Sequence, residues 1–214
     1  MTPKLIYFDI YGRGEVVRMI LRLAGVEFED ERVQLDQWAE YKAAHADLLP
    51  HGKLPVFVFD DGRVLGQTRA IARYLAKQHG LAGIDDFESA QIDMTFDGFE
   101  DFRATYVPYY REKSVGTNDK DKLAEILKEV RAGADKHLQA LEKILQKNGT
   151  GWYVGNKVSW ADLCIAELLD RMNGAQGLLP GVLAPYPHIR ANISKFKELP
   201  IIKEHLASRP QRPY

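Results

Sequence analysis

Three short groups of residues in the first seventy positions carry side chains suited to binding a small anionic ligand. Tyr7 ends an apolar run, and Arg13 stands just before a helical pattern. Lys53-Leu54-Pro55 places a cation beside a proline that lacks an amide donor and can adopt the cis form, which exposes the Leu54 backbone to a partner strand. Gln67-Thr68 falls at a helix N-terminus, where free amides and the helix dipole favour a carboxylate. Together these groups predict that a short, peptide-like anion binds along the edge of a sheet.

Several other chemistries are excluded by their missing motifs. Gly12-Arg13-Gly14 lacks the third glycine and the spacing of a dinucleotide-binding or phosphate-binding loop. The six histidines are dispersed and form no helical pair with metal-ligand spacing. Cys164 is the single cysteine, which excludes an intrachain disulfide, a multi-cysteine zinc site and a Cys-x-x-Cys redox centre.

Composition indicates an ordinary globular protein. The chain has 214 residues, of which 45% are hydrophobic and 28% charged. Its 29 basic and 30 acidic residues give a net charge of −1, which argues against nucleic acid and anionic membranes as partners. A charge interrupts Met1–Asp9 before a signal-peptide apolar region forms, and no window approaches the roughly 18 apolar residues of a membrane span. We therefore expect a cytoplasmic location.

The first eighty residues alternate strand and helix signals. Apolar runs and helical spacing predict a strand at 5–8, a helix from Glu15 to about Leu23 and a second strand at 29–33. Asp60-Asp61-Gly62 lies between two apolar runs and predicts a hairpin. Thr68 is expected to cap a further helix that Gly80 ends. This order predicts an α/β domain over residues 1–80.

After Gly80 the strand signals stop. Residues 81–86 read as a linker, and steps of three and four between apolar residues predict a long amphipathic helix over 120–147. Ser159 and Asp162 have the spacing of a capping box, in which each side chain caps the other residue's amide. Shorter helices are predicted at 188–197 and 201–207, separated by Pro200. Residues 87–214 are therefore predicted to form an all-α domain.

The sequence resembles the cytosolic glutathione S-transferases, most closely the sigma class. The matching residues span nearly the whole chain in the family's order: Lys4-Leu5-Ile6-Tyr7-Phe8, Gly12-Arg13-Gly14-Glu15, Trp38, Lys42, Gly52-Lys53-Leu54-Pro55, Gln67, Ala70-Ile71-Ala72-Arg73-Tyr74-Leu75, Glu100-Asp101-Phe102 and Ser159-Trp160-Ala161-Asp162. The resemblance implies an α/β thioredoxin-like N-terminal domain, an all-α C-terminal domain and a homodimer.

The resemblance also implies a role for each matching residue. Tyr7 would donate its phenolic hydrogen to the sulfur of reduced glutathione, the co-substrate, and Arg13 would support that site electrostatically. The remaining glutathione-binding residues would be Trp38, Lys42 and Lys53 at the glycyl end, Leu54 and Pro55 at the cysteinyl unit, Gln67 and Thr68 at the γ-glutamyl carboxylate, and Asp101 of the partner subunit at the γ-glutamyl amine. Thr68 replaces the more usual serine but keeps the hydroxyl, so we expect binding to be retained.

Each of these side chains also has a purely structural interpretation. Tyr7 could be a strand aromatic with a satisfied hydroxyl, Trp38 a surface aromatic, and Lys42 and Lys53 solvated lysines. The hydrophobic-substrate pocket is predicted from clustered aromatics and their neighbours, which fit a core equally well. Its candidates are Phe8, Ile10, Gly12, Arg103, Tyr106, Tyr109, Tyr110 and Cys164. We interpret Cys164 as a small buried hydrophobe rather than a reactive thiol.

Four acidic residues, Asp93, Asp97, Glu100 and Asp101, share roughly one helix face, where like charges repel. Ion pairs with Arg69 or Arg73 across a dimer interface would offset this repulsion, and we favour that interpretation. A magnesium or calcium ion at the interface is the alternative. The prostaglandin synthase relative binds such an ion, but Glu100 stands here in place of an aspartate.

Two functions follow from the resemblance. The first is an enzyme that adds the glutathione thiolate to apolar electrophiles, with prostaglandin H to D isomerisation as a possible further activity. The second is a non-catalytic protein of the same fold, either structural like the S-crystallins or a carrier of hydrophobic ligands. The full set of glutathione residues and the lack of a long insertion in the C-terminal domain favour the enzyme.

Overall fold

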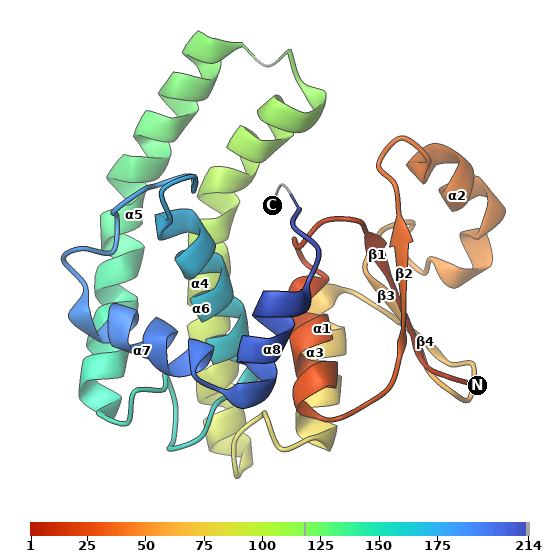
Figure 1. Cartoon of the computed structure of the whole chain (residues 1–214), viewed down its shortest axis with the longest axis horizontal. Coiled ribbons are helices and arrows are strands. Elements are labelled where there is room, and N and C mark those ends of the chain that lie inside the picture. Colours follow the sequence, from red (N-terminus) through yellow and green to blue (C-terminus); the bar gives the residue numbers. More distant parts are fainter. Residues whose placement is uncertain (118, 213–214) are drawn as a thin grey trace. The chain divides into compact units, whose positions relative to one another are not determined.

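The computed structural model describes residues 1–117 and 119–212 and divides them into two compact units (Figure 1). Unit 1 comprises Met1–Ala82 together with the described residues from Lys197 onward. Unit 2 comprises Gly83–Phe196. Among the described residues, no helix has both the length and the apolar character needed to cross a bilayer.

Unit 1 is built on a mixed four-stranded sheet of order β2-β1-β3-β4. The central strand β1 runs parallel to β2, with Tyr7 opposite Arg32, and antiparallel to β3. The elements in chain order are β1 (Lys4–Phe8), α1 (Glu15–Leu23), β2 (Glu29–Val33), α2 (Trp38–Ala44), a 3₁₀ turn η1 (Ala46–Leu48), β3 (Val56–Val58), β4 (Val64–Gly66), α3 (Thr68–Gln78) and α8 (Pro200–Ser208). The predicted α/β domain is confirmed, and it has the thioredoxin-like arrangement.

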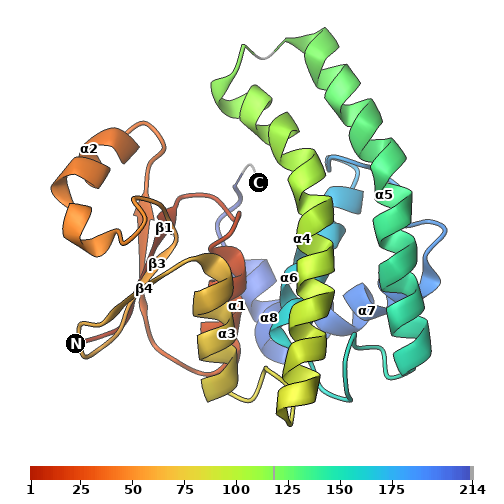
Figure 2. The same ribbon diagram turned by 180° about the vertical axis from the view of Figure 1, so that it is seen from behind.

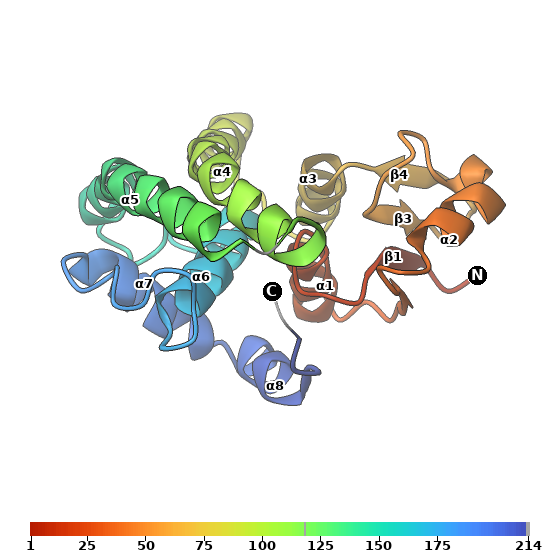
Figure 3. The ribbon, with the colours of Figure 1, turned by 90° about the horizontal axis from the view of Figure 1, so that it is seen from above.

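Helices α1 and α3 lie on one side of this sheet and α2 on the other (Figure 3). The apolar stripes of α1 and α3 are buried, and Val17, Ile20 and Ile71 have no exposed surface. Helix α2, in contrast, buries none of its residues. The sequence predicted α1 and α3 from their apolar spacing and gave no such signal for α2.

The last helix, α8, belongs to unit 1. From the sequence it was instead expected to lie in the all-α domain predicted over residues 87–214. It packs on α1, where the side chain of Ile202 is fully buried. His205 of α8 lies 2.8 Å from the carboxylate of Glu15 at the start of α1. These long-range contacts place the final residues with the sheet, although they follow the helical unit in sequence.

Unit 2 contains α4 (Asp86–Val115), α5 (Lys120–Asn148), α6 (Trp160–Asn173) and α7 (Pro187–Lys197). The long helices α4 and α5 lie side by side, and α6 also packs on α4 (Figure 2). The predicted linker at 81–86 ends as α4 begins, because the Asp85 carboxylate accepts the Glu88 amide at 2.8 Å. The all-α character of this unit is confirmed.

Two predicted helix caps have different outcomes. Ser159 and Asp162 form the expected capping box at the start of α6. Thr68 was expected to cap α3, but it is the first residue of that helix and Gln67 occupies the N-cap without a side-chain hydrogen bond. This correction leaves the buried Thr68 hydroxyl with no hydrogen-bond partner among the described residues.

Candidate functional site

Tyr7 lies at the end of β1, where the chain turns into α1. Its side chain is almost fully buried, and its hydroxyl oxygen accepts the backbone N–H of Arg13 at 2.9 Å. The amide occupies an oxygen lone pair, so the phenolic hydrogen is left to donate to a ligand. The buried guanidinium of Arg18 lies 5.9 Å from the centre of the Tyr7 ring and adds a positive charge beside it.

Two glycines allow the chain to wrap closely around Tyr7. A Cβ atom at Gly12 would lie 2.6 Å from the Tyr7 hydroxyl oxygen, and one at Gly14 would lie 2.6 Å from Cδ1 of the ring. Gly12 also has a φ of +44°, which side-chain-bearing residues rarely adopt. Gly12 was predicted to line a substrate pocket, and in the structure it packs on the tyrosine.

Replacement of Gly14 by alanine is expected to lower the free energy of unfolding by about 1–3 kcal/mol, because the new methyl group overlaps the Tyr7 ring. Gly133→Ala is the matched control, since Gly133 lies within α5 and a Cβ there meets nothing within 4 Å. The control should be neutral or stabilising by up to about 1 kcal/mol, as is usual for glycine inside a helix. Urea denaturation of both variants measures the difference, and equal effects would contradict the close packing of Gly14 on Tyr7.

A pocket of about 270 Å³ lies in unit 1, and Arg13, whose amide donates to Tyr7, is one of the residues that line it. It brings together six residues that the sequence nominated and two that it did not: Arg13, Lys53, Leu54, Pro55, Gln67 and Thr68, with His51 and Gly66. His51 stands two residues before Lys53 in the same turn, a proximity that could have suggested it. Up to three cationic groups therefore surround one small cavity, which suits an anionic ligand.

The backbone around this pocket has two uncommon conformations. The Leu54–Pro55 peptide bond is cis, and Gln67 has a φ of 70°, outside the usual range for a residue with a side chain. The free amides at the start of α3 and the unpartnered Thr68 hydroxyl form one wall. A side-chain-bearing residue held at a positive φ, as Gln67 is, is typical of ligand sites.

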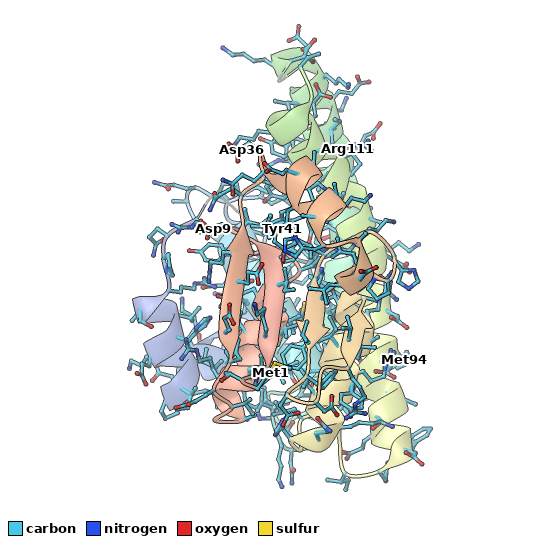
Figure 4. The ribbon with its side chains drawn as sticks, turned by 90° about the vertical axis from the view of Figure 1, so that its right-hand side faces the viewer. Met1, Asp9, Asp36, Tyr41, Met94 and Arg111 are labelled. Carbon is cyan, nitrogen blue, oxygen red and sulfur yellow. The ribbon has the colours of Figure 1, made fainter. Side chains whose placement is uncertain are left out.

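Trp38 and Lys42 reach the same region from α2. The Trp38 ring packs edge-to-face on the Phe8 ring, with 5.3 Å between the ring centres. Lys42 Nζ lies close to Gly52, since a Cβ atom built on this glycine would be 3.2 Å from it. Helix α2 is held to the sheet by the Tyr41 hydroxyl, which donates to the Glu31 carboxylate of β2. Burial and this hydrogen bond raise the pKa of Tyr41 above its usual range, so the hydroxyl stays protonated. Figure 4 shows Tyr41 and Asp9 at the same end of the strands.

The remaining nominated residues are divided between the units. Phe8, Ile10 and Gly12 belong to unit 1. In unit 2, Asp101 is exposed on α4, whereas Arg103 and Tyr106 are buried there. Tyr109 and Tyr110 pack edge-to-face at 5.7 Å.

Within unit 2, two chemical questions posed by the sequence can be addressed. Burial raises the pKa of the Cys164 thiol to about 12, which disfavours a reactive thiolate. Glu100 pairs with Arg103 at 3.6 Å, so part of the repulsion on the acidic face of α4 is offset within the chain. Across residues 1–117 and 119–212, no group of three or more His, Cys, Asp or Glu side chains is arranged to hold a metal ion.

Known proteins resemble this chain over its whole length. Residues 3–77 match the glutathione S-transferase N-terminal domain and residues 100–209 the C-terminal domain. Glutathione S-transferase 1 of Ascaris suum is 43% identical over 99% of this chain and 98% of its own. Among solved structures, the glutathione S-transferase of Ascaris lumbricoides is 41% identical with a TM-score of 0.89 over 100% of both chains. The prostaglandin synthase D of Nilaparvata lugens is 34% identical with a TM-score of 0.81, covering 99% of this chain and 100% of that one.

Proposed function

Because this chain belongs to the glutathione S-transferase family and is a transferase enzyme, we propose that it transfers the thiolate of reduced glutathione to apolar electrophiles and that Tyr7 activates the thiol. The observation that carries this proposal is the position of the Tyr7 hydroxyl. It accepts the Arg13 amide, keeps its own hydrogen for a ligand, and lies near a small cationic pocket.

Thiol activation is a matter of stabilising the anion. A cysteine thiol has a pKa near 8.5 and is mostly protonated at neutral pH, while each unit of lowering corresponds to about 1.4 kcal/mol. A neutral tyrosine can donate a hydrogen bond to the thiolate and so lower the thiol pKa. Arg13, which lines the pocket, and the buried Arg18, beside the Tyr7 ring, add positive charge. The thiol proton is released to solvent, and the thiolate attacks an electrophilic carbon to form a carbon–sulfur bond. In a substitution the leaving group departs with the electron pair of the broken bond. In an addition the π electron pair moves to the neighbouring atom, which takes a proton from solvent.

The pocket residues provide complementary contacts for the rest of glutathione. Lys53, with Trp38 and Lys42 from α2, suits the glycyl carboxylate. The backbone of Leu54, before Pro55, suits the peptide of the cysteinyl unit. Gln67 and the buried Thr68 hydroxyl, at the start of α3, suit the γ-glutamyl carboxylate.

Replacement of Lys53 by methionine is expected to raise the Kd for glutathione about tenfold, because one charge-assisted contact to a carboxylate is lost. Isothermal titration calorimetry with glutathione measures the change. Lys128→Met, at an exposed position on α5, is the control and should bind as the wild type does. A Kd unchanged by Lys53→Met would remove this lysine from the site, and no glutathione binding by the wild type would overturn the proposed function.

In unit 2, we propose that Tyr109 and Tyr110, whose rings pack edge-to-face, contact the apolar second substrate. Similarity to a prostaglandin synthase favours sigma-class membership and prostaglandin H to D isomerisation as a second candidate activity. Incubating the enzyme with prostaglandin H and glutathione tests it. Glutathione-dependent formation of prostaglandin D above the uncatalysed rate would support the isomerase activity. Conjugation of glutathione to electrophiles without formation of prostaglandin D would limit the enzyme to the transferase activity.

We further propose a homodimer in which the exposed Asp101 binds the γ-glutamyl amine of the partner's glutathione. Sedimentation equilibrium tests the assembly, and Asp101→Asn should raise the KM for glutathione only in the dimer. Repeating sedimentation with a chelator distinguishes interface ion pairs from a magnesium or calcium ion. The cytoplasmic location remains a proposal, supported by the resemblance to cytosolic enzymes.

A further inference from the structure

The residues that follow α8 return to the connection between β1 and α1 (Figure 1). We name residues Arg209–Arg212 the C-terminal strap and residues Asp9–Gly14 the Tyr7 loop. The strap and the loop lie about two hundred positions apart in sequence, and both belong to unit 1. No residue of the strap is among those that line the pocket described above.

Tyr11 is at the centre of the contact. Its side chain is buried, and its hydroxyl donates to the carbonyl oxygen of Pro210 at 3.0 Å and accepts the backbone N–H of Arg212 at 3.2 Å. The guanidinium of Arg209 lies 4.1 Å from the centre of the Tyr11 ring. The Tyr11 side chain is thus bound by three of the four strap residues: Arg209, Pro210 and Arg212.

Two ion pairs hold the strap at the start of the loop and just after its end. Arg212 Nε donates to Asp9 Oδ1 at 2.9 Å, and Arg209 Nη1 donates at 2.7 Å to Oε1 of Glu15, the first residue of α1. The hydrogen bond from Arg212 is the largest cause that lowers the pKa of Asp9, to about 2, so this pair stays ionised at neutral pH.

The body of unit 1 also holds the loop. Arg18 Nη1 donates to the Ile10 carbonyl at 3.0 Å, and Arg32 Nη1 lies 3.1 Å from Asp9 Oδ1, the oxygen that Arg212 also binds. The strap therefore completes a set of contacts around the loop. Within the Tyr7 loop, the Arg13 amide donates to the Tyr7 hydroxyl.

We infer that the C-terminal strap positions the Tyr7 loop, so that the Arg13 amide keeps its hydrogen bond to Tyr7 and the phenolic hydrogen is directed at the bound thiol. Tyr11, Arg209 and Arg212 are positioning residues, since they act through the loop. The catalytic consequence rests on the proposed function, whereas the positioning itself does not. A misplaced catalytic group costs rate even when ligand binding is retained.

Tyr11→Phe and Arg212→Ala test this inference, with Arg212→Lys as the conservative variant and Arg131→Ala on α5 as the control. In the ligand-free protein, deuterium exchange at the Arg13 amide should be about tenfold faster in the first two variants, as its hydrogen bond opens more often. Arg212→Lys should recover part of the protection, and Arg131→Ala should exchange as the wild type does. Unchanged Arg13 exchange in both Tyr11→Phe and Arg212→Ala would overturn the inference, whatever the activity.

Kinetics then test the consequence for catalysis. The pKa of the bound glutathione thiol should rise and kcat should fall by about three- to tenfold. The KM for glutathione should stay within about twofold, because no residue of the strap is among those that line the pocket. If the wild type binds glutathione without lowering the pKa of its thiol, the proposed function is refuted. The positioning role of the strap is then tested by the deuterium exchange alone. A wild type with a lowered thiol pKa, unchanged in both variants, would refute the catalytic role of the strap alone.

Discussion

The Tyr7→Phe enzyme should have a kcat/KM roughly a hundredfold below the wild type at neutral pH. A hydrogen bond to a charged group contributes about 1.5–3 kcal/mol, and each 1.4 kcal/mol is a factor of ten. Phenylalanine keeps the ring that Gly12 and Gly14 enclose, so the fold around the site should be retained. The substitution removes the donor to the thiolate and, with it, the acceptor of the Arg13 amide.

The pH dependence of this effect has a definite sign. Stabilising the thiolate lowers the thiol pKa, so the reactive form is present above that pKa and is lost as the pH falls through it. In the variant the pKa returns toward about 8.5 and the activity profile moves to higher pH. The deficit should therefore be largest below neutrality and should shrink as the pH approaches that of the free thiol. Thiolate absorbance during a pH titration of bound glutathione measures the pKa directly.

Tyr74→Phe is the matched control. Tyr74 lies on α3, and its hydroxyl accepts a hydrogen bond from Gln78 rather than lining the pocket. Its removal should change neither the thiol pKa nor the activity. If Tyr7→Phe bound glutathione normally and kept the wild-type thiol pKa, Tyr7 would not be the donor, and another group would have to stabilise the thiolate.

Loss of the Asp162 carboxylate is expected to have the largest effect on stability. Its two oxygens accept four hydrogen bonds, from the backbone amides of Tyr153 and Ser159 at 2.9 Å each, the Ser159 hydroxyl at 2.6 Å and the Asn192 amide at 3.2 Å. The carboxyl is fully buried, and burial raises its pKa while these hydrogen bonds favour the ionised form. In Asp162→Ala the donors remain buried without an acceptor, which costs about 1–3 kcal/mol for each unsatisfied group.

We therefore expect Asp162→Ala to lower the free energy of unfolding by about 4 kcal/mol and the Tm by roughly 10 °C. Thermal and urea unfolding followed by circular dichroism measure both. Glu125→Ala, at an exposed position on α5, is the control and should stay within about 0.5 kcal/mol of the wild type. A loss below about 1 kcal/mol in Asp162→Ala would mean that water or a shifted side chain satisfies the donors.

Local patterns account for the elements that the sequence predicted correctly. Helix α5 repeats apolar residues every three or four positions because one face packs in unit 2, and Asp60-Asp61-Gly62 ends β3 in a turn. The Ser159–Asp162 box depends on a spacing of three residues and on nothing distant. In contrast, α2 buries no residue, and α4 spreads its apolar residues around the helix. Neither helix has an apolar stripe on one face, so the spacing of apolar residues did not predict either of them.

Residue types and local spacing were enough to indicate the family, the α/β and all-α character of the two parts, and the side chains around the proposed thiol site. Which of these groups come into contact depends on the packing of distant segments. His51 joins the cationic pocket, Gly12 and Gly14 enclose Tyr7, and α8 with the residues after it lies on α1 and the Tyr7 loop rather than in unit 2. Periodicity and capping depend on neighbours within about four positions. The contacts of Tyr11 with Pro210 and Arg212 join residues some two hundred positions apart, which no local pattern encodes.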